Sequence, residues 1–567
     1  MKKILFVSIV LLCFIQCKTL QNQNVTDDDL GITARHAMVV SAKEEASQIG
    51  VDIMRKGGNA FDAMVAVELA LAVAYPNAGN IGGGGFMVFR LADGQTGALD
   101  YREKAPKAAT RDMYLDQDGN VIEGLSTFGA MAVGVPGTID GLFKVHERFG
   151  TLPMSEIMQP AIDLARNGVI LTALQADYFN RYKEKMKDAN SYQLLFDRQW
   201  KEGDIIRYDE LAQTLERIRD NGRDEFYEGE TARLTVDYVQ ELGGILTMDD
   251  LAEYRAQWRT PIIFKYKKYD IISMALPSSG GIALAQIMKM LEPYDVGQYA
   301  HNSLEYIQLL TEAERRAYAD RAYYLGDPDF VEVPEKTLLS EKYLQQRMSD
   351  FSWEKASLSS EITHGNVTPF RESEETTHYS IVDPFGNAVA VTTTLNTNYG
   401  SKVYVQGAGF FLNNQMDDFS IKPGTPNVYG LVGSDANAIE SGKRMLSSMT
   451  PTIVEEKGKL RMVLGTPGGS TIITSVLQNI LNVTEFGMTM QESVSKPRFH
   501  HQWLPDEVRL EPGGFEKKTV DALKQKGYAI IEGDFVIIGK VDAILVRPDG
   551  TLEGGADPRG DDVAKGY

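Results

Sequence analysis

The chain has 567 residues, of which 43% are hydrophobic and 24% charged, and its formal net charge is −20. This composition is typical of a globular protein with a sizeable core, and it excludes a disordered, collagenous or disulfide-stapled chain. A nucleic-acid partner is disfavoured because the chain is acidic and has no basic run. The length allows several domains or one large layered structure, at about 150 residues per domain.

The N-terminus has the layout of a secretory signal peptide. Lys2 and Lys3 precede a run from Ile4 to Ile15 that is apolar except for Ser8 and is too short to span a bilayer. We therefore expect residues 1–17 to act as a signal and the protein to be exported, with the periplasm as its destination.

The only two cysteines, Cys13 and Cys17, lie in this segment. The exported body then has no disulfide and no thiol chemistry. Cys17 follows a sequence that loosely matches a bacterial lipoprotein cleavage site. A lipid anchor at Cys17 and ordinary cleavage a few residues later remain alternatives.

The first half of the chain alternates between apolar and charged helical patterns. Residues 42–74 predict mostly helix, and residues 65–75 are so apolar, apart from Glu68, that we expect a buried core helix. Four glycines at 82–85 precede a predicted strand at 87–91. They lack the spacing of a phosphate-binding loop, which favours close backbone packing instead. Residues 150–350 predict charged helices, for example at 210–219 and 303–324.

From residue 376 the pattern becomes rich in β-structure. Strands are predicted at 378–382 and 388–395, joined by a tight turn at 383–387. Further predicted strands are 407–412, 451–454, 462–465 and 536–546, and further helices are 472–483 and 515–526. Mixed helices and antiparallel hairpins in both halves indicate helices layered around sheets.

Several chemistries have no sequence support. The seven histidines form neither a H-E-x-x-H motif nor a Cys-His cluster, so a catalytic zinc site is not expected. The nucleophile elbow of α/β-hydrolases is missing. Asp417 and Asp418 lack the spacing of a Ca²⁺ loop. We interpret His500 and His501 as structural.

One threonine stands out by its position. A polar segment ends at Glu375 and leads directly into a strand that begins with Thr376. Thr394 follows at the end of the returning strand, which the hairpin brings beside the first. This arrangement predicts a hydrogen bond from Thr394 to the Thr376 hydroxyl.

The motifs around these threonines continue through the whole chain after the signal. They include Thr376-Thr377-His378-Tyr379-Ser380, Arg102-Glu103-Lys104-Ala105-Pro106 and Thr466-Pro467-Gly468-Gly469-Ser470, and the blocks 82–85, 386–389, 392–396, 399–400, 413–419, 426–433, 446–452 and 497–502. In order and spacing, this set resembles the γ-glutamyltransferase (γ-glutamyltranspeptidase) family of N-terminal nucleophile hydrolases. The resemblance implies an α+β fold, a four-layer αββα sandwich.

The resemblance also implies self-cleavage between Glu375 and Thr376. The products would be a large subunit, residues 18–375, and a small catalytic subunit, residues 376–567, which stay together as a heterodimer. In the precursor the Thr376 hydroxyl would attack the Glu375 carbonyl, and an N-to-O shift would give an ester that water hydrolyses. Cleavage frees the Thr376 α-amine, whose ordinary pKa of about 7.7 to 8.0 suits a base for its own hydroxyl.

The family's functional residues transfer to positions of this sequence. Thr376 would attack the γ-carbonyl of glutathione or a related γ-glutamyl donor, and water or the amine of an amino acid or dipeptide would resolve the acyl-enzyme. By the same resemblance, Thr394 would support the nucleophile, and the backbone of Gly468 and Gly469 would form an oxyanion hole. Arg102, Ser447 and Ser448 would bind the donor's α-carboxylate. Asp418, with Asn396 and Gln415, would bind its α-ammonium.

Residues 426–437 match a lid loop, with Tyr429 as its closing aromatic. A lid that excludes water favours small donors over long polymers. The resemblance gives no reason to expect a metal or an organic cofactor. Departures from the family pattern at Thr393, Thr450 and Thr466 affect only fine specificity.

Three alternatives remain at this point. A cephalosporin or glutaryl acylase shares the fold but has no use for the ammonium-binding residues, because a glutaryl group has no α-amine. A poly-γ-glutamate depolymerase is disfavoured by the lid. A catalytically inactive binding protein is disfavoured by the complete set of Thr376, Thr394, Gly468 and Gly469.

Overall fold

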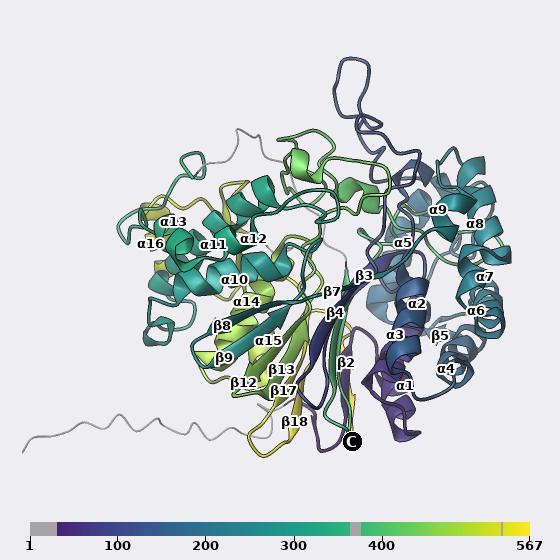
Figure 1. Cartoon of the computed structure of the whole chain (residues 1–567), viewed down its shortest axis with the longest axis horizontal. Helices are drawn as coiled ribbons and strands as arrows, with labels where there is room; N and C mark the ends of the chain where they lie inside the picture. Colours follow the sequence, from purple (N-terminus) through teal and green to yellow (C-terminus); the bar gives the residue numbers. More distant parts are fainter. Residues whose placement is uncertain (1–30, 363–375, 534–536) are drawn as a thin grey trace, which may run out of the picture.

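The computed structural model describes residues 31–362, 376–533 and 537–567. The predicted signal segment with Cys17, and Glu375 of the predicted cleavage site, lie outside these residues. Two seven-stranded sheets pack face to face and helices cover both outer surfaces (Figure 1). This is the four-layer αββα sandwich, and the predicted fold class is confirmed.

Both large sheets are antiparallel throughout, and each combines strands from distant parts of the chain. Sheet I has the order β19 (Val563–Gly566), β2 (Met38–Ser41), β10 (Thr377–Val382), β11 (Ala388–Thr394), β3 (Gly84–Arg90), β4 (Thr96–Asp100) and β7 (Gln257–Arg259). Sheet II has the order β1 (Thr33–Ala34), β18 (Leu552–Gly555), β17 (Asp542–Val546), β13 (Lys459–Gly465), β12 (Thr452–Glu456), β9 (Tyr269–Ser273) and β8 (Ile262–Tyr266).

Smaller sheets lie outside the sandwich. They are formed by β14 (Phe499–His500), β15 (Val508–Leu510) and β16 (Ile530–Glu532), and by β5 (Val169–Ile170) with β6 (Ile205–Ile206).

The helices divide into two layers (Figure 1). The layer on the side of sheet I holds α1 (Glu44–Arg55), α2 (Ala60–Ala74), α3 (Thr138–Phe149), α4 (Met154–Asn167), α5 (Ala173–Asp188), α6 (Asp209–Asn221), α7 (Arg223–Tyr227), α8 (Glu230–Glu241) and α9 (Met248–Ala252). The layer on sheet II holds α10 (Gly280–Leu291), α11 (Leu304–Tyr324), α12 (Glu335–Leu338), α13 (Glu341–Arg347), α14 (Thr471–Thr484), α15 (Met490–Ser495) and α16 (Lys517–Gln525). Among the described helices, none has the length and apolarity needed to cross a membrane.

Helix α2 is the buried core helix that the sequence predicts. All of its residues are buried, as expected for a helix that is apolar on every side. Asn59 and Asp62 form a capping box at its N-terminus, and Asp62 also accepts the Thr151 N–H at 3.0 Å. The cap therefore fixes where α2 begins and joins it to the loop between α3 and α4.

The β10–β11 hairpin forms at the predicted turn. Asp383 Oδ1 accepts the N–H groups of Phe385 and Asn387 at 2.9 and 2.8 Å. Gly386 has a φ of +93°, which favours glycine at this position. The register pairs Thr377 with Thr393, so the start of β10 lies beside the end of β11.

The four glycines at 82–85 are explained by close backbone packing, as predicted. A Cβ at Gly83 would collide with the Thr394 carbonyl, and one at Gly85 would meet the Thr392 carbonyl. Since β3 and β11 are neighbours, these glycines let β3 approach the end of β11 closely.

His378, Ser380 and Thr392 form a buried polar cluster on β10 and β11, close to the start of β10. The ring nitrogens of His378 contact the hydroxyls of Thr392 and Ser380 at 2.9 and 3.1 Å. Burial lowers the pKa of His378 to about 3. The ring is therefore neutral near pH 7 and serves as a structural group rather than a base.

One predicted strand is wrong and another is shortened. Residues 407–412 form no strand, because Gly407 and Gly409 both have a φ of +75° and turn the chain, leaving only an isolated bridge between Tyr404 and Phe411. The strand predicted at 536–546 is β17, which begins at Asp542; residue 536 lies outside the described part of the chain.

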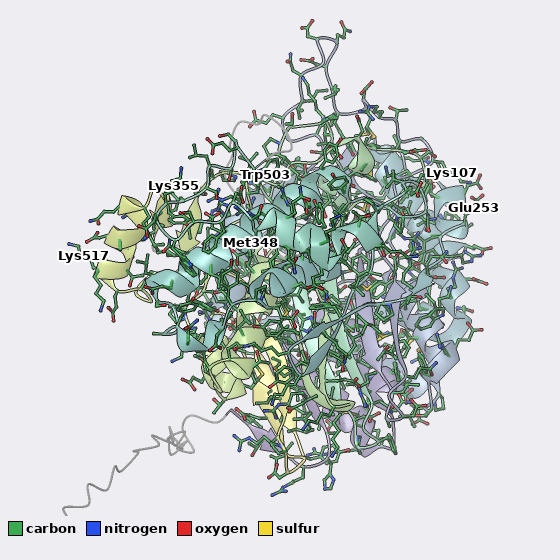
Figure 2. The ribbon with its side chains drawn as sticks, turned by 60° about the vertical axis from the view of Figure 1, so that its left-hand side comes forward. Lys107, Glu253, Met348, Lys355, Trp503 and Lys517 are labelled. Carbon is green, nitrogen blue, oxygen red and sulfur yellow. The ribbon has the colours of Figure 1, made fainter. Side chains whose placement is uncertain are left out.

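Charged side chains cover the outside of the helical layers (Figure 2), where for example Lys107 and Glu253 pair at 2.6 Å. Trp503 is buried instead. Its indole N–H donates to the carbonyls of Ser359 and Ile362, each at 3.0 Å. This contact ties residues 359–362 to the C-terminal third of the chain.

Candidate active site

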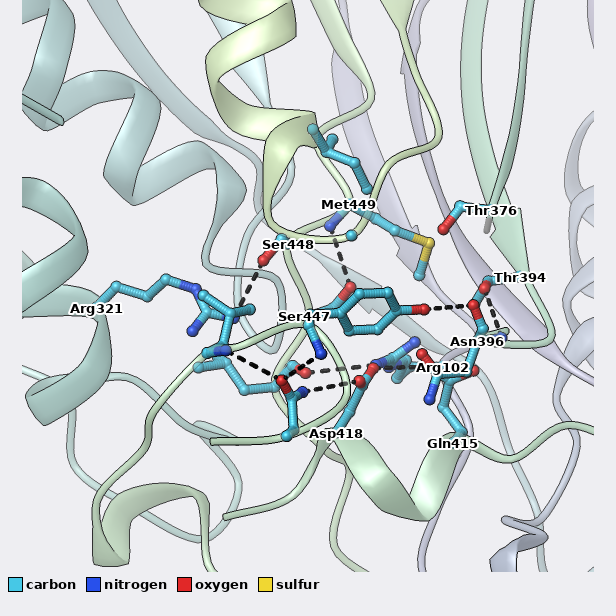
Figure 3. A pocket seen from close by; sticks show the side chains of 16 residues that line it. Arg102, Arg321, Thr376, Thr394, Asn396, Gln415, Asp418, Ser447, Ser448 and Met449 are labelled. Atoms are coloured by element: carbon cyan, nitrogen blue, oxygen red, sulfur yellow. Dashed lines mark hydrogen bonds and ion pairs between the residues drawn. The ribbon is translucent and has the colours of Figure 1, made fainter. Parts of the chain in front are cut away.

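A pocket opens where β10 begins and β11 ends (Figure 3). It encloses about 330 Å³, part of it open to solvent. Its lining consists of Arg102, Arg321, Thr376, Thr394, Asn396, Gln415, Asp418, Asn427, Tyr429, Leu431, Leu446, Ser447, Ser448, Met449, Gly469 and Ile472. The predicted site residues thus come together here, except that Gly468 lies next to the lining and Glu375 is outside the described residues.

Thr376 lies directly before β10 and is only 4% exposed. The predicted hydrogen bond from Thr394 to its hydroxyl is not among the hydrogen bonds of the described residues. Thr394 Oγ1 instead accepts the Asn396 N–H at 2.7 Å. The hairpin brings the two threonines into one pocket, and the turn after β11 holds the Thr394 oxygen while leaving its proton free to donate.

The opposite charges of the pocket contact each other. The Arg102 guanidinium donates to Asp418 Oδ2, and its Nη1 lies 3.7 Å from Glu103 Oε2. Gln415 donates to the same Asp418 oxygen at 2.7 Å. Arg102 is 1% exposed, so this ion pair is shielded from bulk water.

Glu103 behind Arg102 is fully buried. Burial raises the pKa of its carboxyl to about 7, although the Arg102 charge opposes this shift. Neither Glu103 oxygen has a hydrogen-bond partner among the described residues. Glu103 therefore neutralises Arg102 only in part, and the main counter-charge of Arg102 is Asp418.

Two adjacent serines face the pocket from the segment before β12. Ser447 Oγ accepts the Met449 N–H at 3.1 Å, and Ser448 Oγ accepts from Arg321 Nη2 at 3.1 Å. Since both oxygens act as acceptors, each hydroxyl keeps its proton for another partner.

Gly468 and Gly469 form the turn between β13 and α14. Their φ angles are +133° and +52°, a conformation that favours glycine. Within the described residues neither N–H donates a hydrogen bond. Both lie at the N-terminus of α14, where the helix dipole favours negative charge.

The Tyr429 ring lies over Gly469, where any side chain would collide with it. The Tyr429 hydroxyl donates to the Asn396 carbonyl and closes one side of the pocket. Asp417 holds the loop at 426–437 by accepting the Val428 N–H at 2.9 Å. It also accepts the Ser126 hydroxyl at 2.7 Å and so joins this loop to the first half of the chain. Burial raises the pKa of Asp417 to about 6.

The structure adds pocket residues that sequence reasoning missed, above all Arg321. It lies on α11, for which the sequence predicts only a charged helix at 303–324, whereas the structure buries most of this helix. No local signal distinguishes Arg321 from Arg315 and Arg316 of the same helix. Within the described residues, no group of three His, Cys, Asp or Glu side chains is arranged to hold a metal ion.

Thr376 stands at the start of β10, a central strand of the αββα sandwich, and shares its pocket with Gly469 at the N-terminus of α14. This arrangement defines the class of N-terminal nucleophile hydrolases. A family model described as gamma-glutamyltranspeptidase matches residues 46–567. The chain belongs to the γ-glutamyltranspeptidase family.

Individual relatives agree with this assignment. The chain is 47% identical over 544 residues to the glutathione hydrolase proenzyme of Escherichia coli K12, covering 94% of this chain and 93% of that one. Among solved structures, the cephalosporin acylase of Bacillus halodurans covers 97% of this chain and 99% of its own, with a TM-score of 0.83 and 25% identity. The γ-glutamyltranspeptidase of Helicobacter pylori covers 61% of this chain and 97% of its own, with a TM-score of 0.56 and 39% identity.

Proposed function

We propose that this protein is a γ-glutamyltransferase and glutathione hydrolase with Thr376 as its nucleophile. The observation that carries the proposal is the pairing of Arg102 with Asp418 in the pocket that Thr376 lines. The ammonium and carboxylate of an α-amino acid sit on one carbon, so they need adjacent partners of opposite charge. Arg102 and Asp418 are such partners.

The donor's head group would exchange the protein's own ion pair for two new ones. Its α-carboxylate would bind Arg102 and the hydroxyl protons of Ser447 and Ser448. Its α-ammonium would bind Asp418, with Gln415 and Asn396 as polar neighbours. The γ-carbonyl then extends towards Thr376 and the Gly468–Gly469 turn.

The chemistry follows the acyl-enzyme route. The Thr376 hydroxyl attacks the γ-carbonyl and its proton passes to the freed Thr376 α-amine, directly or through water. The N–H groups of Gly468 and Gly469 stabilise the oxyanion. The leaving amine takes the proton, and water or the amine of an amino acid or dipeptide then attacks the ester and restores the hydroxyl.

The nucleophile would be generated by self-cleavage between Glu375 and Thr376, which divides the chain into residues 18–375 and 376–567. The similar Escherichia coli protein is described as a proenzyme, which supports this maturation. The Helicobacter pylori chain corresponds to only 61% of this one, which supports division into two subunits. Export to the periplasm, with or without a lipid on Cys17, remains a proposal from the N-terminal sequence.

The test of maturation is denaturing intact mass with N-terminal sequencing of the fragments, on the native protein and on Thr376→Ala. We expect two fragments, the smaller starting at Thr376, and an uncut variant without glutathione turnover. A native chain that stays uncut and still cleaves a γ-glutamyl anilide would contradict the mechanism.

The likeness to a cephalosporin acylase structure makes a glutaryl acylase the second candidate. A glutaryl group has no ammonium, so Asp418 and Gln415 would face an apolar methylene. We expect the native enzyme to cleave γ-glutamyl p-nitroanilide at least 100-fold more efficiently than glutaryl p-nitroanilide, about 3 kcal/mol of discrimination. Equal efficiency would favour the acylase. The Tyr429 loop over the pocket disfavours a third candidate, a depolymerase of long poly-γ-glutamate.

A further inference from the structure

Arg321 is a buried cation at the wall of the pocket, and the proposed function gives it no role. It is 5% exposed, and among the described residues its guanidinium forms no ion pair within 4.0 Å, although the charge of Asp418 acts on it from further away. Burial lowers its pKa to about 10, so the group stays protonated at pH 7. A buried charge without a counter-ion is unfavourable unless hydrogen bonds or a ligand compensate it.

The hydrogen bonds of Arg321 all lead to the serine pair. Its Nη2 donates to Ser448 Oγ at 3.1 Å, and its Nε donates to Ser279 Oγ at 2.9 Å. The Ser279 hydroxyl in turn donates to the Ser447 carbonyl at 2.6 Å. Figure 3 shows Arg321 reaching Ser448 from the side away from Thr376.

These contacts determine whether the Ser448 hydroxyl donates to Arg321 or accepts from it. A guanidinium only donates, so Ser448 Oγ must be the acceptor and its proton must point elsewhere. The Ser448 carbonyl is already occupied by the Thr450 hydroxyl at 2.7 Å, which fixes the backbone of the turn. No acceptor for the Ser448 proton exists among the described hydrogen bonds, so it is available to an anion in the pocket.

The charge balance of the pocket also supports a role for Arg321 towards an anion. Arg102 is already paired with Asp418 and lies near Glu103, whereas Arg321 has no carboxylate partner among the described residues. Arg102 and Arg321 carry two positive charges against the one negative charge of Asp418, and a zwitterionic donor does not change this balance. Once the donor's ammonium takes up Asp418, its carboxylate is the anion left for Arg102 and, from behind the serine turn, for Arg321.

We propose that Arg321 is a positioning residue for recognition of the donor's α-carboxylate: it turns the Ser448 hydroxyl proton into the pocket, holds the 447–448 turn through Ser279, and supplies the positive charge behind that turn. The inference rests on the proposed function and names a specificity element within it. Arg321 acts through Ser448 and does not touch the reacting atoms.

The test compares Arg321→Met and Arg321→Lys with the native enzyme on two donors. One is γ-glutamyl p-nitroanilide; the other is 4-aminobutanoyl p-nitroanilide, the same compound without its carboxylate. For Arg321→Met we expect kcat/KM on the first donor to fall roughly 10- to 100-fold, mainly through KM, with less than a twofold change on the second. Arg321→Lys keeps the charge but not the two directed N–H groups, so we expect an intermediate loss.

A double variant checks the route of the effect. If Arg321 acts through the Ser448 hydroxyl, Arg321→Met combined with Ser448→Ala loses little more than the worse single variant. The proposal would be overturned if the fold-loss in kcat/KM of the double variant equalled the product of the two single losses. Equal losses on both donors would also overturn it, and either result would leave Arg321 a structural role.

Arg316→Met is the matched control. Arg316 lies on the same helix, is fully buried, and pairs with Glu312 at 2.7 Å. Its removal leaves the buried Glu312 carboxylate with Arg315 at 3.6 Å as its remaining cation, so we expect a lower Tm without a change in the preference between the two donors. Arg321→Met removes a charge without an ion-pair partner together with two hydrogen bonds, so we expect its Tm to fall less than that of Arg316→Met.

Two outcomes separate this inference from the proposed function. A native enzyme that does not cleave γ-glutamyl p-nitroanilide contradicts the proposed function, and the inference with it. An active native enzyme whose Arg321→Met variant keeps its KM contradicts the inference alone. If that variant does not mature, calorimetric titration with L-glutamate and 4-aminobutyrate gives the same comparison, with a 10- to 100-fold loss of affinity expected for glutamate only.

Discussion

At the scale of single residues, the pocket holds a buried ion pair whose two charges match those of the zwitterionic donor that we propose. Arg102 and Asp418 are separated by 316 positions in the chain yet form one buried ion pair. Breaking a buried pair by removing one partner costs about 3 to 5 kcal/mol. The pair therefore keeps both side chains in place until a donor offers each of them a new partner.

Asp418→Asn tests this recognition. We expect kcat/KM for γ-glutamyl p-nitroanilide to fall by about 100-fold or more, since the ammonium loses its counter-charge, an effect of about 3 kcal/mol or more. Glutaryl p-nitroanilide, which has no ammonium, should lose less than about tenfold.

The control for Asp418→Asn is Asp177→Asn. Asp177 is an exposed carboxylate of α5 that pairs with Arg181 outside the pocket lining, and we expect less than a twofold change with either donor. Similar losses for Asp418→Asn on the two donors would show that Asp418 supports the pocket without reading the ammonium.

At the scale of elements, α2 is coupled to the strand that begins after Thr376. The Tyr379 hydroxyl of β10 donates to Glu68 Oε2 of α2 at 2.7 Å. Glu68 is the one carboxyl among the apolar residues 65–75 of this helix, and burial raises its pKa from 4.5 to about 7. The protonated carboxyl is therefore the form that the fold prefers.

The sign of the pH dependence follows from this shift. The folded pKa lies above the unfolded one, so the stabilisation from the bound proton is complete below about pH 4.5 and is lost as the pH rises through about 7. Glu68→Gln imitates the protonated form. We expect it to match the native protein at about pH 4 and to be more stable at pH 8 by up to about 3 kcal/mol.

Thermal melting at the two pH values measures this difference, with exposed Glu202→Gln as the control that should follow the native protein. A Glu68→Gln variant with a lower Tm than the native protein at pH 8 would mean that the Glu68 carboxylate stabilises the fold.

At the scale of the whole molecule, the two predicted subunits are interleaved. In sheet I the strands β10 and β11 lie between β2 and β3, and in sheet II β12 pairs with β9. Each sheet therefore contains strands from both sides of residue 376. Separating the fragments would break ladders within both sheets and expose the core between them.

We therefore expect the cleaved protein to elute from a gel-filtration column as one species that contains both fragments. Molar salt should not separate them, because the shared ladders and core do not depend on surface charge. Guanidinium chloride should separate them only at concentrations where circular dichroism also reports unfolding. Fragments that part under native conditions would contradict the interleaved topology.

Much of the fold follows from local patterns. The helical pattern at 42–74 with its apolar stretch at 65–75 predicted a buried helix here, and the turn at 383–387 predicted the β10–β11 hairpin, because periodicity and turn residues act over short distances. The same patterns failed at 407–412, where two glycines with positive φ turn a segment that has the composition of a strand.

The sequence by itself determined the family and the set of residues to examine, since ordered motifs carry both without reference to space. Only the tertiary structure decided how the charges combine: that Arg102 contacts Asp418, that Asn396 occupies the Thr394 oxygen, and that Arg321 stands behind Ser448. Arg321 and Ser448 are separated by 127 positions and lie on different elements. Contacts of this kind arise from the packing of α11 against the serine turn, and no local pattern records them.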